Sequence, residues 1–191
     1  MIVKAPPLRI IVMGVSGSGK STLAQGLSQA LKIRMKDGDE LHLPQSVAKM
    51  SAGIALQDED RWPWLDRIAD YLNNVENSAL GISGGIVACS ALKKIYRDRI
   101  REQAGPVVFL FLDGSPELIR QRMLERQGHY MQADLLDSQL QTLENPTPQE
   151  TDVIRLTIHQ SIAEILQHAL EQLQAMRPND ALQPALSLQS N

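Results

Sequence analysis

Short apolar runs alternate along the chain with stretches whose apolar residues lie three and four positions apart. The first pattern is typical of buried strands and the second of amphipathic helices. Strands are predicted at residues 9–13, 33–36, 86–89, 107–112 and 153–156, and helices at 20–31, 44–50, 62–75, 92–103, 116–126, 133–144 and 161–176. Strands that alternate with helices favour a parallel five-stranded sheet flanked by helices, a three-layer α/β fold.

The chain is long enough for one well-buried domain. It has 191 residues, of which 43% are hydrophobic and 21% are charged, close to the averages of globular proteins. We expect a single domain over residues 1–176. Pro, Asn, Gln and Ser dominate the remainder, so residues 177–191 are predicted to form a flexible tail.

The net charge, the apolar runs and the cysteine content indicate which classes of partner the protein lacks and in which cellular compartment it acts. The formal net charge of −3 gives no basic surface for nucleic acid. No apolar run is long enough to span a membrane, and the N-terminus lacks a signal-peptide pattern. The only cysteine, Cys89, cannot form an internal disulfide and is interpreted as a small buried residue rather than a nucleophile. We therefore expect a cytoplasmic protein without nucleic-acid or membrane partners.

The segment between the first predicted strand and the first predicted helix fits the phosphate-binding pattern G-x-x-x-x-G-K-[ST]. Its glycines let the loop curl with N–H groups directed inward, and the following helix adds the positive end of its dipole. Lys20 can reach the β- and γ-phosphates, and the Ser21 hydroxyl can ligate Mg²⁺. A nucleoside triphosphate is thus expected to bind at Gly14, Val15, Ser16, Gly17, Ser18, Gly19, Lys20, Ser21 and Thr22.

Two carboxylates, Asp37 and Asp39, follow the second predicted strand. Ligands of parallel sheets gather at the carboxyl ends of the strands, and in an extended chain these two side chains would point the same way. One carboxylate could support Mg²⁺, and the other could accept a proton from an attacking hydroxyl or orient it. The alternative is a simple turn, because Asp-Gly is common in turns. The third strand ends without a carboxylate, which favours the metal interpretation.

Cations also lie near predicted strand ends and helix starts. Arg61 begins a predicted helix, where the dipole disfavours a cation, and its planar guanidinium could clamp an anionic substrate. The alternative is a surface ion pair with an adjacent aspartate. Lys93, Arg97 and Arg101 share one helical face after the third strand, and at least one is expected to point into the cleft. The alternative there is a solvated basic face.

Residues 122–145 are where a small P-loop kinase would carry a mobile lid. Arg122 and Arg126 share a helical face, and His129 follows them. Lid arginines neutralise charge on a transferring phosphoryl group and help to exclude water. A lone histidine is otherwise a structural or exposed residue, and that alternative stands for His129.

These segments together resemble the gluconokinase family of small P-loop sugar-acid kinases over about residues 10–150. The most specific blocks are Arg-Trp-Pro-Trp-Leu from residue 61 and Cys-Ser-Ala-Leu-Lys-Lys from residue 89. The other matching positions are residues 13–21, 37–39, 41–42, 49–50, 53, 56, 58, 60, 96–98, 122, 126, 128–129 and 138–139.

The resemblance implies phosphorylation of the 6-hydroxyl of D-gluconate by ATP, giving 6-phospho-D-gluconate and ADP for the pentose phosphate route. It also implies Mg²⁺, a cytoplasmic location, a homodimer and a fold like those of nucleoside-monophosphate and shikimate kinases. By analogy to shikimate kinases, Asp37 would serve the metal together with Ser21, and Asp39 would hold the substrate hydroxyl. The implied catalytic residues are Lys20, Asp39, Arg122 and Arg126, and the implied substrate contacts are Asp39, His42, Lys49, Arg61, Lys93, Arg97 and His129.

The sequence departs from the family pattern after the Asp-Gly-Asp block. The family has His-Pro there and an Asn three residues further, whereas this chain has His42-Leu43-Pro44 and Ser46. The change affects the expected sugar-acid preference rather than phosphoryl transfer. A kinase for another small hydroxy-acid or a nucleotide, and a non-catalytic nucleotide-binding module, remain the alternatives. A GTPase is disfavoured because the guanine-binding motif Asn-Lys-x-Asp is absent from the sequence.

Overall fold

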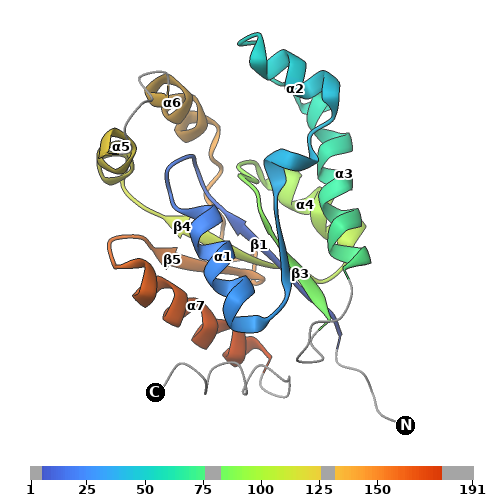
Figure 1. Cartoon of the computed structure of the whole chain (residues 1–191), viewed down its shortest axis with the longest axis vertical. Coiled ribbons are helices and arrows are strands. Elements are labelled where there is room, and N and C mark those ends of the chain that lie inside the picture. The colour runs from blue at the N-terminus through green and yellow to red at the C-terminus, as the bar shows by residue number, and fades with distance from the viewer. Residues whose placement is uncertain (1–5, 76–82, 126–131, 178–191) are drawn as a thin grey trace.

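The computed structural model describes residues 6–75, 83–125 and 132–177. A parallel five-stranded sheet in the order β2-β3-β1-β4-β5 forms its centre (Figure 1). The strands are β1 (Leu8–Met13), β2 (Arg34–Asp37), β3 (Gly84–Ala88), β4 (Val108–Asp113) and β5 (Val153–Thr157). The helices are α1 (Lys20–Leu31), α2 (Pro44–Ser51), α3 (Asp58–Asn74), α4 (Lys94–Ala104), α5 (Pro116–Glu125), α6 (Gln132–Thr142) and α7 (Ile162–Met176), with a short 3₁₀ helix η1 (Gly38–Leu41). The predicted sheet and its flanking helices are confirmed.

Side chains of β1 alternate between two hydrophobic cores, as the pleat of a strand requires. Ile10 and Val12 pack in the core that α1 and α7 cover, whereas Ile11 and Met13 pack in the core that α3 and α4 cover. All four side chains are fully buried. Figure 1 shows the two pairs of helices on opposite faces of the sheet. Burial on both faces explains why β1 is a continuous apolar run.

The start of α3 differs from the sequence prediction. The helix begins at Asp58, four residues before the predicted start at residue 62. The Asp60 carboxylate accepts a hydrogen bond from the Gln57 N–H at 3.0 Å, which satisfies a donor at the helix end. Three acidic residues in the first turn add favourable charge at the N-terminus of the helix dipole.

Helices α5 and α6 carry most of the described part of the predicted lid, and an ion pair between Arg120 and Asp137 joins them. Residues 126–131, with Arg126 and His129, lie outside the described residues, as do residues 178–191 of the predicted tail. None of the described helices has the length and apolarity to cross a membrane.

Candidate active site

The phosphate-binding loop lies between β1 and α1, and α5 packs against it. Gly17 has a φ of 80°, which favours glycine, and a Cβ there would lie 2.6 Å from Cγ of Met123, which would have to shift. Gly19, the N-cap of α1, has a φ of 101°, and a Cβ on it would meet no atom of the described residues within 4 Å beyond its chain neighbours. The loop therefore keeps an open space at the N-terminus of a helix, where anions bind.

Two side chains of the loop are suited to bind phosphate. The Lys20 ammonium donates to the Val15 carbonyl at 3.0 Å. Burial lowers the pKa of Lys20, and the nearby Asp39, Cys89 and Asp37 oppose that shift. The Ser18 hydroxyl oxygen is buried and has no hydrogen-bond partner among the described residues. A buried hydroxyl without a partner is costly, so this group fits a site that gains an anionic ligand.

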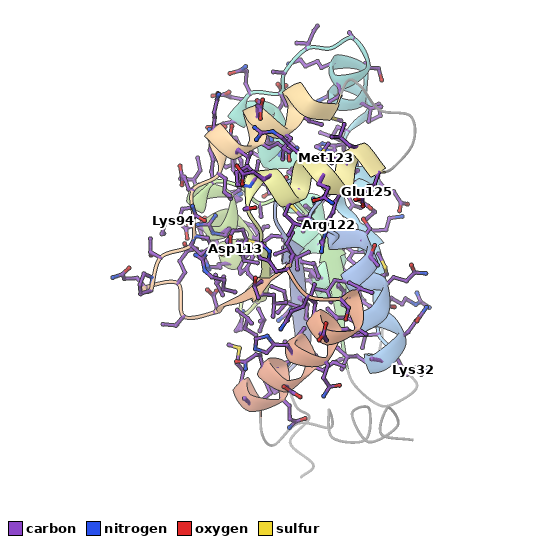
Figure 2. All side chains as sticks on the ribbon, turned by 90° about the vertical axis from the view of Figure 1, so that its left-hand side faces the viewer. Lys32, Lys94, Asp113, Arg122, Met123 and Glu125 are labelled. Atoms are coloured by element: carbon purple, nitrogen blue, oxygen red, sulfur yellow. The ribbon has the colours of Figure 1, made fainter. Side chains whose placement is uncertain are left out.

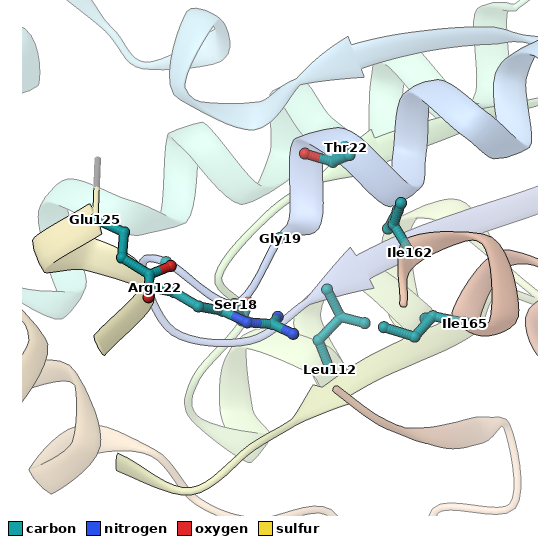
Figure 3. A pocket seen from close by; sticks show the side chains of 9 residues that line it. Ser18, Gly19, Thr22, Leu112, Arg122, Glu125, Ile162 and Ile165 are labelled. Carbon is teal, nitrogen blue, oxygen red and sulfur yellow. The ribbon is translucent and has the colours of Figure 1, made fainter. Parts of the chain in front are cut away.

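A cavity of about 300 Å³ opens beside the loop. Figure 3 shows the Arg122 side chain extending from α5 past Ser18 toward Leu112, with Ile162 and Ile165 of α7 on the far side. The guanidinium of Arg122 donates to the Ile158 carbonyl. In Figure 2, Arg122 projects from α5 on the same side of the molecule as Asp113, which ends β4. Lys32 marks the C-terminal end of α1, away from the phosphate-binding loop. The cavity therefore combines a cation, loop amides and apolar walls.

The chain that carries Asp37 and Asp39 does not stay extended, contrary to the geometry assumed from the sequence. The chain turns into η1 directly after Asp37, and the Asp37 carboxylate accepts from the Asp39 N–H at 3.1 Å. Its other oxygen accepts from the Ser21 hydroxyl at 3.0 Å. Asp37 thus caps a turn and still meets Ser21 of the phosphate-binding loop. Hydroxyl and carboxylate oxygens are the ligands that Mg²⁺ prefers, although no group of three His, Cys, Asp or Glu side chains suited to a metal occurs in the described ranges.

Trp64 and Gly38 fix the turn that carries these carboxylates. The indole Nε1 of Trp64 donates to the Gly38 carbonyl at 2.7 Å. A Cβ on Gly38 would lie 2.7 Å from the backbone oxygen of Ala88 in β3. The turn can therefore approach β3 only because residue 38 lacks a side chain.

Gly38→Ala is expected to destabilise the fold and to displace Asp37 and Asp39. Overpacking against a backbone atom costs about 1–3 kcal/mol, which corresponds to a Tm loss of roughly 2–12 °C for a chain of this size. Thermal unfolding followed by circular dichroism measures the change, with Ser51→Ala at an exposed position of α2 as the control. An unchanged Tm for Gly38→Ala would contradict the close packing of this turn.

Two of the cations that were predicted to bind substrate, Lys93 and Lys49, form ion pairs within the protein. The Lys93 ammonium contacts both oxygens of the Asp58 carboxylate, at 2.8 and 3.0 Å, and Tyr96 donates to the same carboxylate. These hydrogen bonds, first from Lys93 and then from Tyr96, lower the pKa of Asp58. The Lys49 ammonium lies 2.6 Å from Asp60. Both lysines thus already have carboxylate partners.

Arg61 and His42 have polar atoms without partners. The Nε of Arg61 and the Nδ1 of His42 are buried and have no hydrogen-bond partner among the described residues. Arg61 also donates from Nη2 to the Leu56 carbonyl at 3.2 Å, and its guanidinium lies 5.6 Å from the ring centre of Tyr96. The His42 ring stacks on Trp64 at 4.3 Å. Burial, which outweighs the nearby Asp39, lowers the pKa of His42.

Comparisons with known proteins give a consistent family. A model described as an AAA domain matches residues 10–147. The thermosensitive gluconokinase of Escherichia coli (strain K12) is 42% identical over 171 residues, which cover 88% of this chain and 89% of that protein. The crystal structure of a gluconokinase from Sinorhizobium meliloti 1021 is 41% identical, with a TM-score of 0.79 over 97% of this chain and 98% of that one. The chain belongs to the gluconokinase family.

More distant structures share the fold alone. The shikimate kinase from Aquifex aeolicus vf5 is 16% identical, with a TM-score of 0.54 over 91% of this chain and 100% of that one. The predicted P-loop kinase fold is thereby confirmed, and the relationship to the gluconokinases is much closer than the relationship to shikimate kinases.

The prediction that Arg97 contacts the substrate is wrong for this member of the gluconokinase family. Its side chain is completely buried and donates to both oxygens of Glu150, at 2.8 and 2.7 Å. It also donates to the carbonyls of Ala91 and Leu92, at 3.2 Å each. Arg101, on the same helical face, pairs with Glu150 as well. Arg97 and Arg101 are therefore engaged with the segment before β5 rather than directed into the cleft.

Ser46, in the family's Asn position, points into the protein interior. The Ser46 side chain is fully buried, and its hydroxyl donates to the Asp60 carbonyl at 3.5 Å. Cys89 is buried as predicted, and burial raises the pKa of its thiol to about 12, so it is not a nucleophile.

Sequence reasoning assigned no role to Gln139, although it lies in a block that matches the family. Its side chain Oε1 accepts from the Ser16 N–H at 2.6 Å, across 123 positions of sequence. The only sequence signal was its place in that block.

Proposed function

We propose that this chain transfers the terminal phosphoryl group of ATP to the 6-hydroxyl of D-gluconate, giving 6-phospho-D-gluconate and ADP. The observation that carries the proposal is the hydrogen bond between Ser21 and Asp37. It joins the phosphate-binding loop to the carboxylate-bearing turn after β2, so that a phosphate donor and a hydroxyl acceptor can meet between them. Membership of the gluconokinase family, whose E. coli relative is named for this activity, supports the choice of acceptor.

ATP would lie with its phosphates along residues 14–22. Loop N–H groups, Lys20 and the Ser18 hydroxyl would bind the phosphate oxygens. Ser21 and Asp37 would hold Mg²⁺, which neutralises charge on the β- and γ-phosphates when it is bound. The cavity between Arg122 and the two isoleucines of α7 is suited to the nucleoside, because its lining combines apolar side chains with polar ones.

The acceptor hydroxyl would be oriented by Asp39, which lies two residues beyond the metal-binding carboxylate. The hydroxyl oxygen forms a bond to the γ-phosphorus while the bond between that phosphorus and the bridging oxygen of ADP breaks. The hydroxyl proton passes to Asp39. Lys20 and Arg122, together with Arg126 as inferred from the sequence, would stabilise the charge that develops on the transferring group.

The carboxylate of gluconate would bind to Arg61. Among the predicted cations with described side chains, Lys49 and Lys93 are neutralised by aspartates and Arg97 is buried with Glu150. The Nε–H group of Arg61 has no hydrogen-bond acceptor among the described residues. It could therefore donate to the substrate carboxylate, which an arginine can contact through two N–H groups. His42 would contact a hydroxyl of the sugar acid, and His129 stays a proposed contact from the sequence.

We extend the proposal to the setting of the reaction. A single kinase domain over residues 1–176 with a mobile lid near 122–145 would act in the cytoplasm as a homodimer and feed the pentose phosphate route. The chain length and composition support the domain bounds, the family resemblance supports the other points, and the single cysteine agrees with a reducing compartment.

The test is ADP release from Mg-ATP with D-gluconate, related aldonates, shikimate, glycerate and nucleoside monophosphates as acceptors. We expect strong turnover that is selective for gluconate. Selective turnover of another acid would retain the phosphoryl-transfer chemistry and reject gluconate as the acceptor. ADP release that no acceptor stimulates would reject the kinase proposal in favour of a nucleotide-binding module.

A further inference from the structure

One peptide group of the phosphate-binding loop is held from both sides. The carbonyl oxygen of Val15 accepts from the Lys20 ammonium at 3.0 Å. The N–H of Ser16, which belongs to the same peptide group, donates to Oε1 of Gln139 at 2.6 Å. A lysine that is expected to bind phosphate and a glutamine of α6 therefore act on opposite ends of one peptide plane.

Packing of α6 holds Gln139 in place. Leu136, three residues earlier on the same helical face, is fully buried in the core that α1 and α7 cover. Leu140 packs against the same core, and the ion pair between Arg120 and Asp137 ties α6 to α5. The Gln139 amide thus reaches the loop from a helix that is anchored on two sides.

We propose that Gln139 is a positioning residue for phosphoryl transfer, which it supports by fixing the Val15–Ser16 peptide. The inference rests on the proposed function. When ATP binds, Lys20 is expected to exchange the Val15 oxygen for phosphate oxygens. Gln139 then remains as the side chain that holds this peptide. A freed peptide would let the loop amides and Lys20 shift, and small misplacements of catalytic groups lower turnover strongly.

The residue type agrees with this role. A glutamine accepts the Ser16 N–H without adding negative charge beside bound phosphates, whereas a carboxylate would repel them. Two substitutions therefore distinguish the effect of the hydrogen bond from the effect of charge. Glutamate keeps the acceptor oxygen but adds a negative charge, whereas methionine removes the acceptor at similar side-chain length.

The test compares Gln139→Met and Gln139→Glu with Gln141→Ala, an exposed control on the same helix. For Gln139→Met we expect kcat to fall about tenfold, the worth of roughly one hydrogen bond, with KM for ATP and for gluconate within about threefold of wild type. Gln139→Glu should recover most of kcat but raise KM for ATP. The amide proton resonance of Ser16 should move upfield in Gln139→Met alone.

The outcomes separate this inference from the proposed function. If wild type releases no gluconate-dependent ADP, the proposed function fails. If wild type is active and Gln139→Met has a kcat within twofold of Gln141→Ala, the role of Gln139 fails. An unmoved Ser16 resonance in Gln139→Met would also overturn it. If Gln139→Met and Gln139→Glu lose the same share of kcat and both have a lowered Tm, then Gln139 only contributes to the packing of α6, and its positioning role fails.

Discussion

Lys20→Met is expected to lower kcat for gluconate-dependent ADP release by about 10²–10³-fold, the usual effect of removing one stabiliser of transition-state charge. The lysine ammonium lies inside the phosphate-binding loop, 3.0 Å from the Val15 carbonyl. Burial lowers its pKa, so the surroundings favour a ligand that restores charge compensation. Phosphate oxygens are such a ligand, and the ammonium would follow the charge as it moves to the bridging oxygen of ADP.

Initial rates at saturating ATP and gluconate measure this effect. Lys94→Met is the matched control, because Lys94 is exposed at the start of α4. Within the described residues its one ion pair is with Asp98, one turn further along the same helix. The control should keep kcat within about twofold of wild type, and the Tm of Lys20→Met should stay within a few degrees. Turnover of Lys20→Met within about twofold of wild type would reject the proposed role of Lys20.

Arg97→Met is expected to destabilise the protein by about 3 kcal/mol, because it removes one partner of a buried ion pair. Glu150 would keep Arg101 as a partner but lose two hydrogen bonds. The carbonyls of Ala91 and Leu92 would lose their side-chain donor as well. Ala91 has a φ of 43°, an unfavourable backbone conformation for a residue with a Cβ, so the turn after β3 depends on these contacts.

Chemical denaturation measures the free energy of unfolding, with Arg99→Met as the control on the same helix. Arg99 pairs with Asp66 near the surface, where such pairs contribute at most about 1 kcal/mol. Hydrogen bonds, first from Arg97 and then from Arg101, lower the pKa of Glu150 from the usual 4.5 to about 2 in the folded protein. This stabilisation is present above the usual pKa and is lost as the pH falls toward 2. The difference between Arg97→Met and wild type should therefore shrink on acidification. Equal stability of Arg97→Met and Arg99→Met at neutral pH would contradict this account.

The amino-acid sequence by itself determined the features whose causes are local. The phosphate-binding loop could be recognised because its glycines, Lys20 and Ser21 lie within eight consecutive residues between a strand and a helix. The apolar run of β1 and the helical spacing of α1 follow from side-chain burial along a single element. The order of strands and helices then favoured a parallel sheet, and such sheets bring their carboxyl ends to one edge.

Only the tertiary structure decided which distant residues the polar side chains contact. Charge and spacing made Arg97 a candidate for substrate binding, and the structure removes it because its partner is Glu150, 53 positions further along the chain. Gln139 meets Ser16 across 123 positions. The turn into η1 after Asp37 brings residue 38 close to Ala88 of β3, a contact between segments 50 positions apart. Contacts between distant segments depend on how helices pack against the sheet, and local propensity and periodicity carry no information about that packing.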